Sequence, residues 1–237
     1  MITLLLFAAP LYLWPAGAAR QGNLEERFAP PPGAERVELP ADSFGAWLRR
    51  LPLLPDGAPV HLYDGSLKAR QDVHAAVVDL DVGRRDLQQC ADAVMRLRAE
   101  YLRSRKLPIV FHPDPGKPRE LRWEGGDFGK FLVRLFAEAG TASLAAELHP
   151  LGARAPAPGD VLIQGGYPGH AVLVLDAADA PDGRRFILLG QSYMPAQEFH
   201  VLRNPTGGVW YDAAALDGAG VQTPEWRPFF RRDARRF

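Results

Sequence analysis

Apolar residues recur at helical spacing in two segments of the chain. Residues 87–101 place them at three- and four-residue intervals, which predicts a helix with one buried face. That face consists of Leu87, Cys90, Val94, Leu97 and Tyr101. Asp86 is the expected N-cap of this helix, and Gln89 completes a capping-box pattern. A second helix is predicted over residues 128–136, ending before Gly140.

The later part of the chain changes to short runs of β-branched and apolar residues. Gly, Pro or Asp-Gly turns separate these runs, which predicts an antiparallel meander of strands. The expected strands cover residues 160–164, 171–176, 186–190 and 200–202, with earlier strands at 60–63 and 74–82. Residues 108–122 are polar and Pro-rich and are expected to connect the two helices. N-terminal helices packed on a late antiparallel meander predict an α+β fold.

The N-terminus has the pattern of a secretory signal peptide. Residues 1–19 contain no charged side chain, and residues 2–14 are apolar except for Thr3. Small residues at 16–19 predict cleavage near Ala19, so we expect a periplasmic or secreted protein without stable membrane insertion after cleavage. An uncleaved anchor is the alternative.

The composition of residues 20–237 indicates two segments. Residues 20–40 are expected to form an extended, Pro-rich lead, and residues 41–237 a single globular domain. Lys plus Arg and Asp plus Glu balance at 28 each, so charge favours no nucleic-acid partner. The Arg-rich segment 227–235 is expected to be a solvated tail.

Three polar residues carry candidate chemistry on this frame. Cys90, the only cysteine, lies in the first turn of its predicted helix, where the helix dipole favours a thiolate. His170 begins a strand after a Gly-rich turn and could act as a base, and Gln191 ends the next strand and could orient the imidazole. Gln88 and Gln89, beside the thiol, could donate to an oxyanion.

At these residues the sequence resembles papain-like hydrolases of bacterial cell-wall turnover, especially the CHAP-type amidases. The shared pattern is a Cys at a helix start, followed by the Gly-Asp strand at 159–163 and the Gly-His strand at 169–172. The resemblance implies a papain-like fold with Cys90 as nucleophile, His170 as base and Gln191 as orienting residue. It also implies an amidase or peptidase that requires no cofactor and acts on peptidoglycan peptide.

Over its mature length the chain looks closer to an uncharacterised family of exported bacterial proteins known by a domain of unknown function. That family name implies no activity. The segments that carry the resemblance are 51–53, 62–65, 86–93, 96–102, 168–172, 191–197 and 223–226.

Other interpretations remain open for the same residues. Cys90 lies on the apolar stripe and could be a small buried hydrophobe. His170 could bind a loop carbonyl, and the whole protein could be a non-catalytic envelope protein that binds glycan or another envelope protein. A metal site at His74, Asp79 and Asp81 is disfavoured, because in a strand His74 faces away from the two carboxylates.

Overall fold

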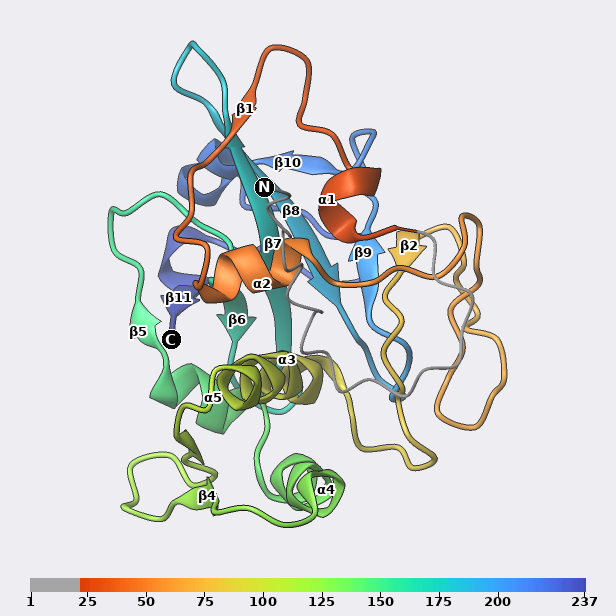
Figure 1. The fold of residues 1–237 in the computed structure, drawn as a ribbon. Helices are drawn as coiled ribbons and strands as arrows, with labels where there is room; N and C mark the ends of the chain where they lie inside the picture. Colours follow the sequence, from red (N-terminus) through yellow and green to blue (C-terminus); the bar gives the residue numbers. More distant parts are fainter. Residues whose placement is uncertain (1–21) are drawn as a thin grey trace, which may run out of the picture.

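A computed structural model describes residues 22–237 of the chain (Figure 1). The expected signal peptide, residues 1–19, lies outside the described residues. Within residues 22–237, no helix combines the length and the apolar character needed to cross a membrane.

The structure is a mixed α+β fold around a nine-stranded sheet, which confirms the predicted fold class at this level. The strand order is β2-β9-β8-β7-β6-β11-β5, with β1 added to β7 and β10 to β8, and every pairing is antiparallel. The strands are β1 (Glu35–Arg36), β2 (His74–Val77), β5 (His149–Pro150), β6 (Val161–Gln164), β7 (His170–Asp179), β8 (Arg185–Gln191), β9 (His200–Leu202), β10 (Trp210–Asp212) and β11 (Ala234–Arg236).

Strands β6 to β9 confirm the predicted meander. β7 and β8 form a hairpin whose turn contains Asp182-Gly183, and Gly183 has the positive φ of 85° that this turn requires. Alternate residues of β7 face opposite sides of the sheet, so that Leu173 and Val174 belong to two different apolar clusters. The sheet is therefore buried on both faces.

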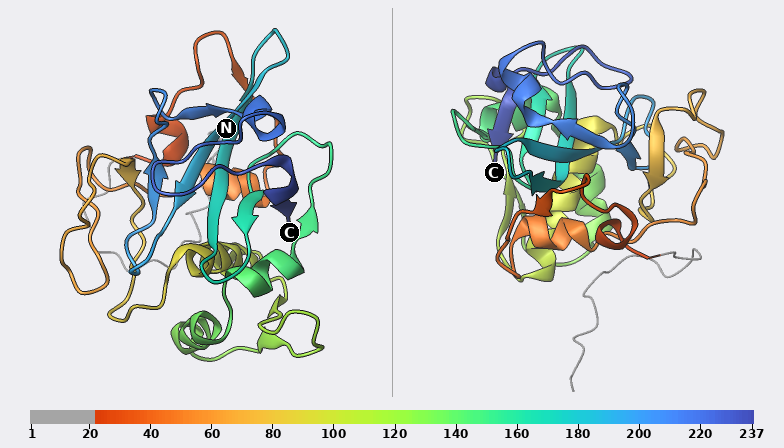
Figure 2. Two further views of the ribbon diagram at one scale, coloured as in Figure 1. Left: turned by 180° about the vertical axis from the view of Figure 1, so that it is seen from behind. Right: turned by 90° about the horizontal axis from the view of Figure 1, so that it is seen from above.

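Helices cover one face of the sheet, and the C-terminal segment covers the other (Figures 1 and 2). The helices α2 and α3 both contact β7 directly, whereas α4 packs on α3. The α-helices are α1 (Leu24–Arg27), α2 (Phe44–Arg49), α3 (Cys90–Ser104), α4 (Phe128–Glu138) and α5 (Thr141–Glu147), and the short 3-10 helices are η1 (Ala213–Asp217) and η2 (Arg231–Asp233).

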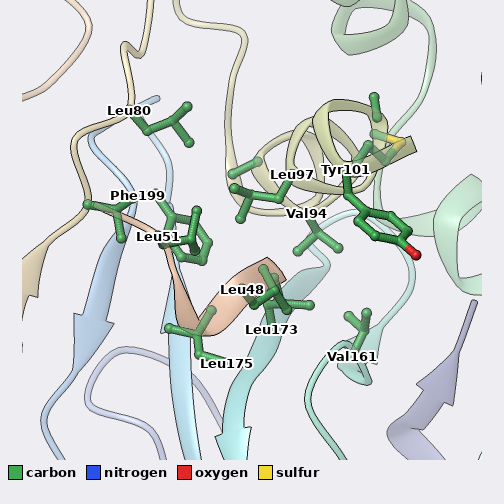
Figure 3. Close-up of a cluster of buried hydrophobic side chains, with 14 of the residues drawn as sticks. Leu48, Leu51, Leu80, Val94, Leu97, Tyr101, Val161, Leu173, Leu175 and Phe199 are labelled. Carbon is green, nitrogen blue, oxygen red and sulfur yellow. The ribbon is translucent and has the colours of Figure 1, made fainter. Parts of the chain in front are cut away.

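The helix-side core is shown in Figure 3, where Val94 and Leu97 of α3 lie near Leu48 of α2 and Leu173 of β7. All four side chains are fully buried. The face predicted for this helix is therefore the face that contacts the sheet. Its burial fixes α3 across the strand that begins with His170.

The start of α3 differs from the prediction by three residues. The helix begins at Cys90 with Gln89 as N-cap, and the Asp92 carboxylate accepts the Gln89 backbone N–H at 3.0 Å. Asp86, the expected cap, instead accepts the Ala196 backbone N–H at 2.7 Å. Asp86 therefore does not cap the helix, because its carboxylate binds a backbone group that is distant in the sequence.

The segment 20–40 is more structured than its proline content predicts. It contributes α1 and the strand β1, which pairs with the end of β7. Arg36 of β1 and Arg49 of α2 both donate to the buried carboxylate of Asp176, at 2.7 and 2.6 Å. The Arg36 ion pair fastens the lead to the sheet, and residues 24–27 are helical, so the expectation of an extended lead was wrong for this part.

Further differences lie in the loops. Residues 60–63 form isolated bridges instead of a strand, and the strand expected over 74–82 ends at Val77. The segment 108–122 contains most of a small hairpin, β3 (Ile109–Phe111) with β4 (Leu121–Trp123). The expected Arg-rich tail instead contains η2 and most of β11, which pairs with β5 and β6. The residue after this tail, Arg236, binds Asp160 through two nitrogens at 2.6 and 2.7 Å.

Candidate functional site

His170 is the first residue of β7 and is completely buried. The preceding Gly169 leaves no room for a side chain, because a Cβ there would lie 2.7 Å from the Gln164 carbonyl oxygen. The imidazole packs against Tyr193 and Trp226, with ring centroids 5.0 and 5.1 Å away. Burial lowers the pKa of His170 to about 4, so the ring is neutral at neutral pH.

A chain of hydrogen bonds leads from His170 to a buried ion pair. The His170 Nε2 lies 2.8 Å from Gln191 Oε1, and Gln191 Nε2 donates to Glu225 at 2.9 Å. The other oxygen of Glu225 accepts from Lys68 Nζ at 2.6 Å. Both ion-pair side chains are almost inaccessible, at 7% for Lys68 and 9% for Glu225.

This chain has a direction, which sets the tautomer of His170. The ion-paired Glu225 carboxylate only accepts, so Gln191 presents its NH₂ group to Glu225 and its oxygen to His170. His170 Nε2 must then carry the proton, which leaves the lone pair on Nδ1. The Nδ1 atom is buried and has no hydrogen-bond partner within the described residues. His170 is thus a neutral ring with one acceptor nitrogen that has no partner among the described residues, which include Cys90.

Cys90 lies beside the start of β7. It is the first residue of α3, and the backbone N–H of Ala171, the residue after His170, acts to lower the pKa of its thiol. Burial raises the pKa of the Cys90 thiol to about 11, against the smaller opposing effect of backbone N–H donors. The expectation that the helix N-terminus lowers this pKa was therefore wrong, since desolvation has the larger effect.

The thiol lines a cavity of about 250 Å³, called here the Cys90 cavity. Cys90 itself is only 4% exposed. The cavity is bounded by the helix start, the end of α4 and the loop before His170, and its lining residues are Asp86, Leu87, Gln89, Cys90, Ala91, Asp92, Phe136, Ala139, Gly140, Thr141, Gly166, Tyr167, Pro168, Gly169 and Met194. The sulfur is thus adjacent to a space that a ligand could enter.

The two glutamines before Cys90 face different spaces. Gln89 lines the Cys90 cavity, and its Nε2 uses one hydrogen on Asp86 at 2.9 Å. The second hydrogen remains for an oxyanion. Gln88 is buried, accepts from Arg96 and lines a separate cavity, so the structure does not bring it to the thiol.

A larger open groove of about 720 Å³, called here the Trp226 groove, lies on the other side of Pro168. Pro168 lines both spaces, and Tyr193 and Trp226, the two rings that cover His170, line the groove. Its remaining lining residues are Arg70, Pro224, Glu225 and Arg227. The Cys90–His170 region therefore separates two spaces of different character.

Sequence reasoning missed Lys68 and Glu225. Glu225 stands in the 223–226 segment that resembles the unknown-function family, and that segment was the one available signal. Lys68 lies in a loop whose pattern distinguishes it from no other surface lysine. Among residues 22–237, no three His, Cys, Asp or Glu side chains come together in a group that could hold a metal ion.

Comparison with known proteins places the chain in a family without a described activity. No curated protein and no solved structure matches it. One family model, described as "Domain of unknown function (4846)", matches residues 24–125 and 117–236. Because these matches cover nearly all the described residues, the chain belongs to this family of unknown function.

Proposed function

We propose that the protein is a papain-like cysteine hydrolase that cleaves an amide bond, with Cys90 as nucleophile, His170 as base and Gln191 as orienting residue. The observation that carries the proposal is the position of Cys90, which is the first residue of α3 and lines a cavity closed by the loop that leads to His170 at the start of β7.

The resting pair is a neutral thiol and a neutral imidazole, because burial shifts both pKa values in the direction that disfavours charge. His170 Nδ1 accepts the thiol proton as the sulfur attacks the carbonyl carbon of the substrate. The protonated imidazole then returns this proton to the departing amine, and a thioester remains. Water, activated by the same nitrogen, hydrolyses the thioester and restores the thiol.

The developing oxyanion has two donors in this proposal. The backbone N–H of Cys90 is at the first position of α3 and therefore has no partner within the helix. The second donor is the side-chain amide of Gln89, whose Nε2 has one hydrogen not used on Asp86 and which lines the Cys90 cavity. Two converging donors of this kind are typical of acyl-transfer sites.

The expected leader at residues 1–19 gives the proposal a compartment. An exported amidase in the periplasm or outside the cell would meet cell-wall peptide, which is the substrate that we propose. The mature protein would then act in solution after removal of the leader.

A second candidate function rests on the Trp226 groove. Two aromatic rings and two arginines line an open space of about 720 Å³, a combination that suits binding of a glycan or an acidic envelope protein without catalysis. In that case the buried thiol would have only a packing role.

Alkylation of Cys90 separates the two functions without knowledge of the substrate. We expect iodoacetamide to label the wild type at neutral pH, and His170→Ala to slow labelling roughly 100-fold because the base is lost. His74→Gln is the matched control, since His74 is also buried and also has an Nδ1 without a partner among the described residues, but it lies on β2 and not at the start of β7. Equally slow labelling of the wild type and His170→Ala would refute the hydrolase and favour the binding protein.

Activity is measured in parallel on peptides released from bacterial cell wall. Newly formed amino groups are quantified by mass spectrometry, and Cys90→Ser should abolish their formation while the circular dichroism spectrum stays unchanged. Peptide cleavage that persists in Cys90→Ser would also exclude the proposed nucleophile.

A further inference from the structure

The Cys90 cavity contains acidic side chains and no basic one. Asp86 and Asp92 both line it, whereas none of its lining residues within the described part of the chain is Lys, Arg or His. The Trp226 groove on the other side of Pro168 has two arginines instead. A cavity with this charge pattern favours a cationic group over an anionic one.

Asp92 has one carboxylate oxygen that lacks a partner among residues 22–237. Its Oδ2 accepts the Gln89 backbone N–H at 3.0 Å, but its Oδ1 has no hydrogen-bond partner within the described residues. The residue is 6% exposed, and burial raises the pKa of its carboxyl group to about 8. A buried acceptor without a donor is costly, so a donor supplied by a ligand would relieve that cost.

Asp86 has a different role, because its Oδ1 already accepts from the Ala196 backbone and from Gln89 Nε2. Asp86 is also exposed, so solvent can satisfy its Oδ2, whereas the Oδ1 of Asp92 is buried and lacks a donor in the described part of the chain. Asp92 follows Cys90 by two positions in α3, and both residues line the same cavity.

We propose that the Cys90 cavity binds an ammonium group and that Asp92 is the residue that recognises it. Building on the proposed hydrolase function, this defines the substrate class as amides with a free amino group close to the scissile carbonyl, as at the amino terminus of a peptide. The short separation of Asp92 from the nucleophile excludes recognition of an ammonium group many residues away. Asp92 would act as a specificity residue, and it takes no part in the proton transfers.

Charged thiol reagents of equal reach test this proposal at Cys90 itself. We compare the trimethylammonium-ethyl and sulfonato-ethyl methanethiosulfonates, because the ratio of their rate constants cancels the fraction of thiolate. Above the Asp92 pKa of about 8, the cation should react faster than the anion. We expect Asp92→Asn to lower this ratio about tenfold or more, since one charge acts oppositely on the two reagents at short range.

Glu138→Gln is the matched control. Glu138 ends α4 next to the cavity wall but binds Arg119 and Arg134, and it does not line the cavity. Its replacement should leave the ratio unchanged. A ratio that is equal in the wild type and Asp92→Asn would overturn the proposal, as would a native protein whose Cys90 reacts with neither reagent.

The wild type alone provides a second measurement in case Asp92→Asn fails to fold. Its ratio should rise between about pH 6 and pH 9 as Asp92 ionises around a pKa of about 8. The other titratable groups that line the cavity are Asp86, Cys90 and Tyr167. Cys90 affects both rates equally, and a flat ratio over this range would contradict the role of Asp92.

Failure of this inference can be told apart from failure of the hydrolase proposal. If His170→Ala slows labelling but the charge ratio does not depend on Asp92, the hydrolase proposal stands and the ammonium site is wrong. If the ratio depends on Asp92 but labelling is insensitive to His170, the cavity binds cations in a protein that is not a cysteine hydrolase.

Discussion

Replacing Glu225 with glutamine tests the buried ion pair that ends the His170 hydrogen-bond chain. Glu225→Gln keeps the size of the side chain but leaves the Lys68 ammonium group, 7% exposed, without its counter-charge at 2.6 Å. Breaking a buried ion pair in this way costs about 3 to 5 kcal/mol of unfolding free energy. In a domain of this size that cost corresponds to a melting temperature lower by about 6 to 20 °C.

A double-mutant cycle isolates the interaction. Lys68→Met leaves Glu225 unpaired and should cost a similar amount, whereas the Lys68→Met, Glu225→Gln variant removes both charges. We therefore expect the double variant to cost less than the sum of the two single variants, by about 1 to 3 kcal/mol. Urea unfolding followed by circular dichroism measures all four proteins. Asp72→Asn is the control, because its pair with Arg70 is exposed to solvent and its loss should leave the unfolding free energy unchanged.

The same variant reports on His170. A glutamine at 225 can either donate to or accept from Gln191, so the Gln191 amide loses its fixed orientation. Nitrogen-15 NMR should then detect both tautomers of His170, in contrast to protonation of Nε2 alone in the wild type. Additive effects within about 0.5 kcal/mol, together with an unchanged tautomer, would refute the idea that the ion pair fixes the imidazole.

Three further results are expected. Leu97→Ala should lower the unfolding free energy by about 2 to 5 kcal/mol in urea titrations, because Leu97 is fully buried between α3 and the sheet. Asp176→Asn should cost about 3 to 5 kcal/mol by leaving Arg36 and Arg49 without their shared carboxylate, as differential scanning calorimetry would detect. Burial lowers the pKa of His200 to about 3, so below about pH 6.5 the unfolded state binds more protons and stability falls toward pH 3. His200→Gln should weaken that fall in urea titrations at neutral and acidic pH.

The elements that the sequence predicted well are those whose pattern repeats. β6, β7 and β8 combine continuous apolar runs with Asp-Gly or Pro-Gly turns, and α4 has one apolar stripe, so local signals sufficed. The α3 start was misplaced because Asp86 satisfies the capping pattern but binds Ala196, which is 110 residues away in the chain. Tertiary contacts of this kind leave no local signal.

Local patterns likewise predicted some residues of the candidate site and missed others. Cys90, His170 and Gln191 stand at the ends of regular elements, where a sequence pattern can place them. Lys68 and Glu225 lie in irregular segments separated by 157 residues, and only the folded chain brings them together. The Cys90 pKa was misjudged because the sequence gives the position in the helix but not the extent of burial.

The position of β11 has a consequence for folding during synthesis. Arg236 binds Asp160, a residue made 76 positions earlier, and β11 lies between β6 and β5 in the sheet. At about 5 to 20 residues per second, the ribosome needs roughly 4 to 15 seconds to make the intervening chain. During that interval β6 has an unpaired edge, which is open to wrong partners. The nascent protein therefore depends on its last strand to close the sheet, and a chaperone that covers the β6 edge would have seconds in which to bind.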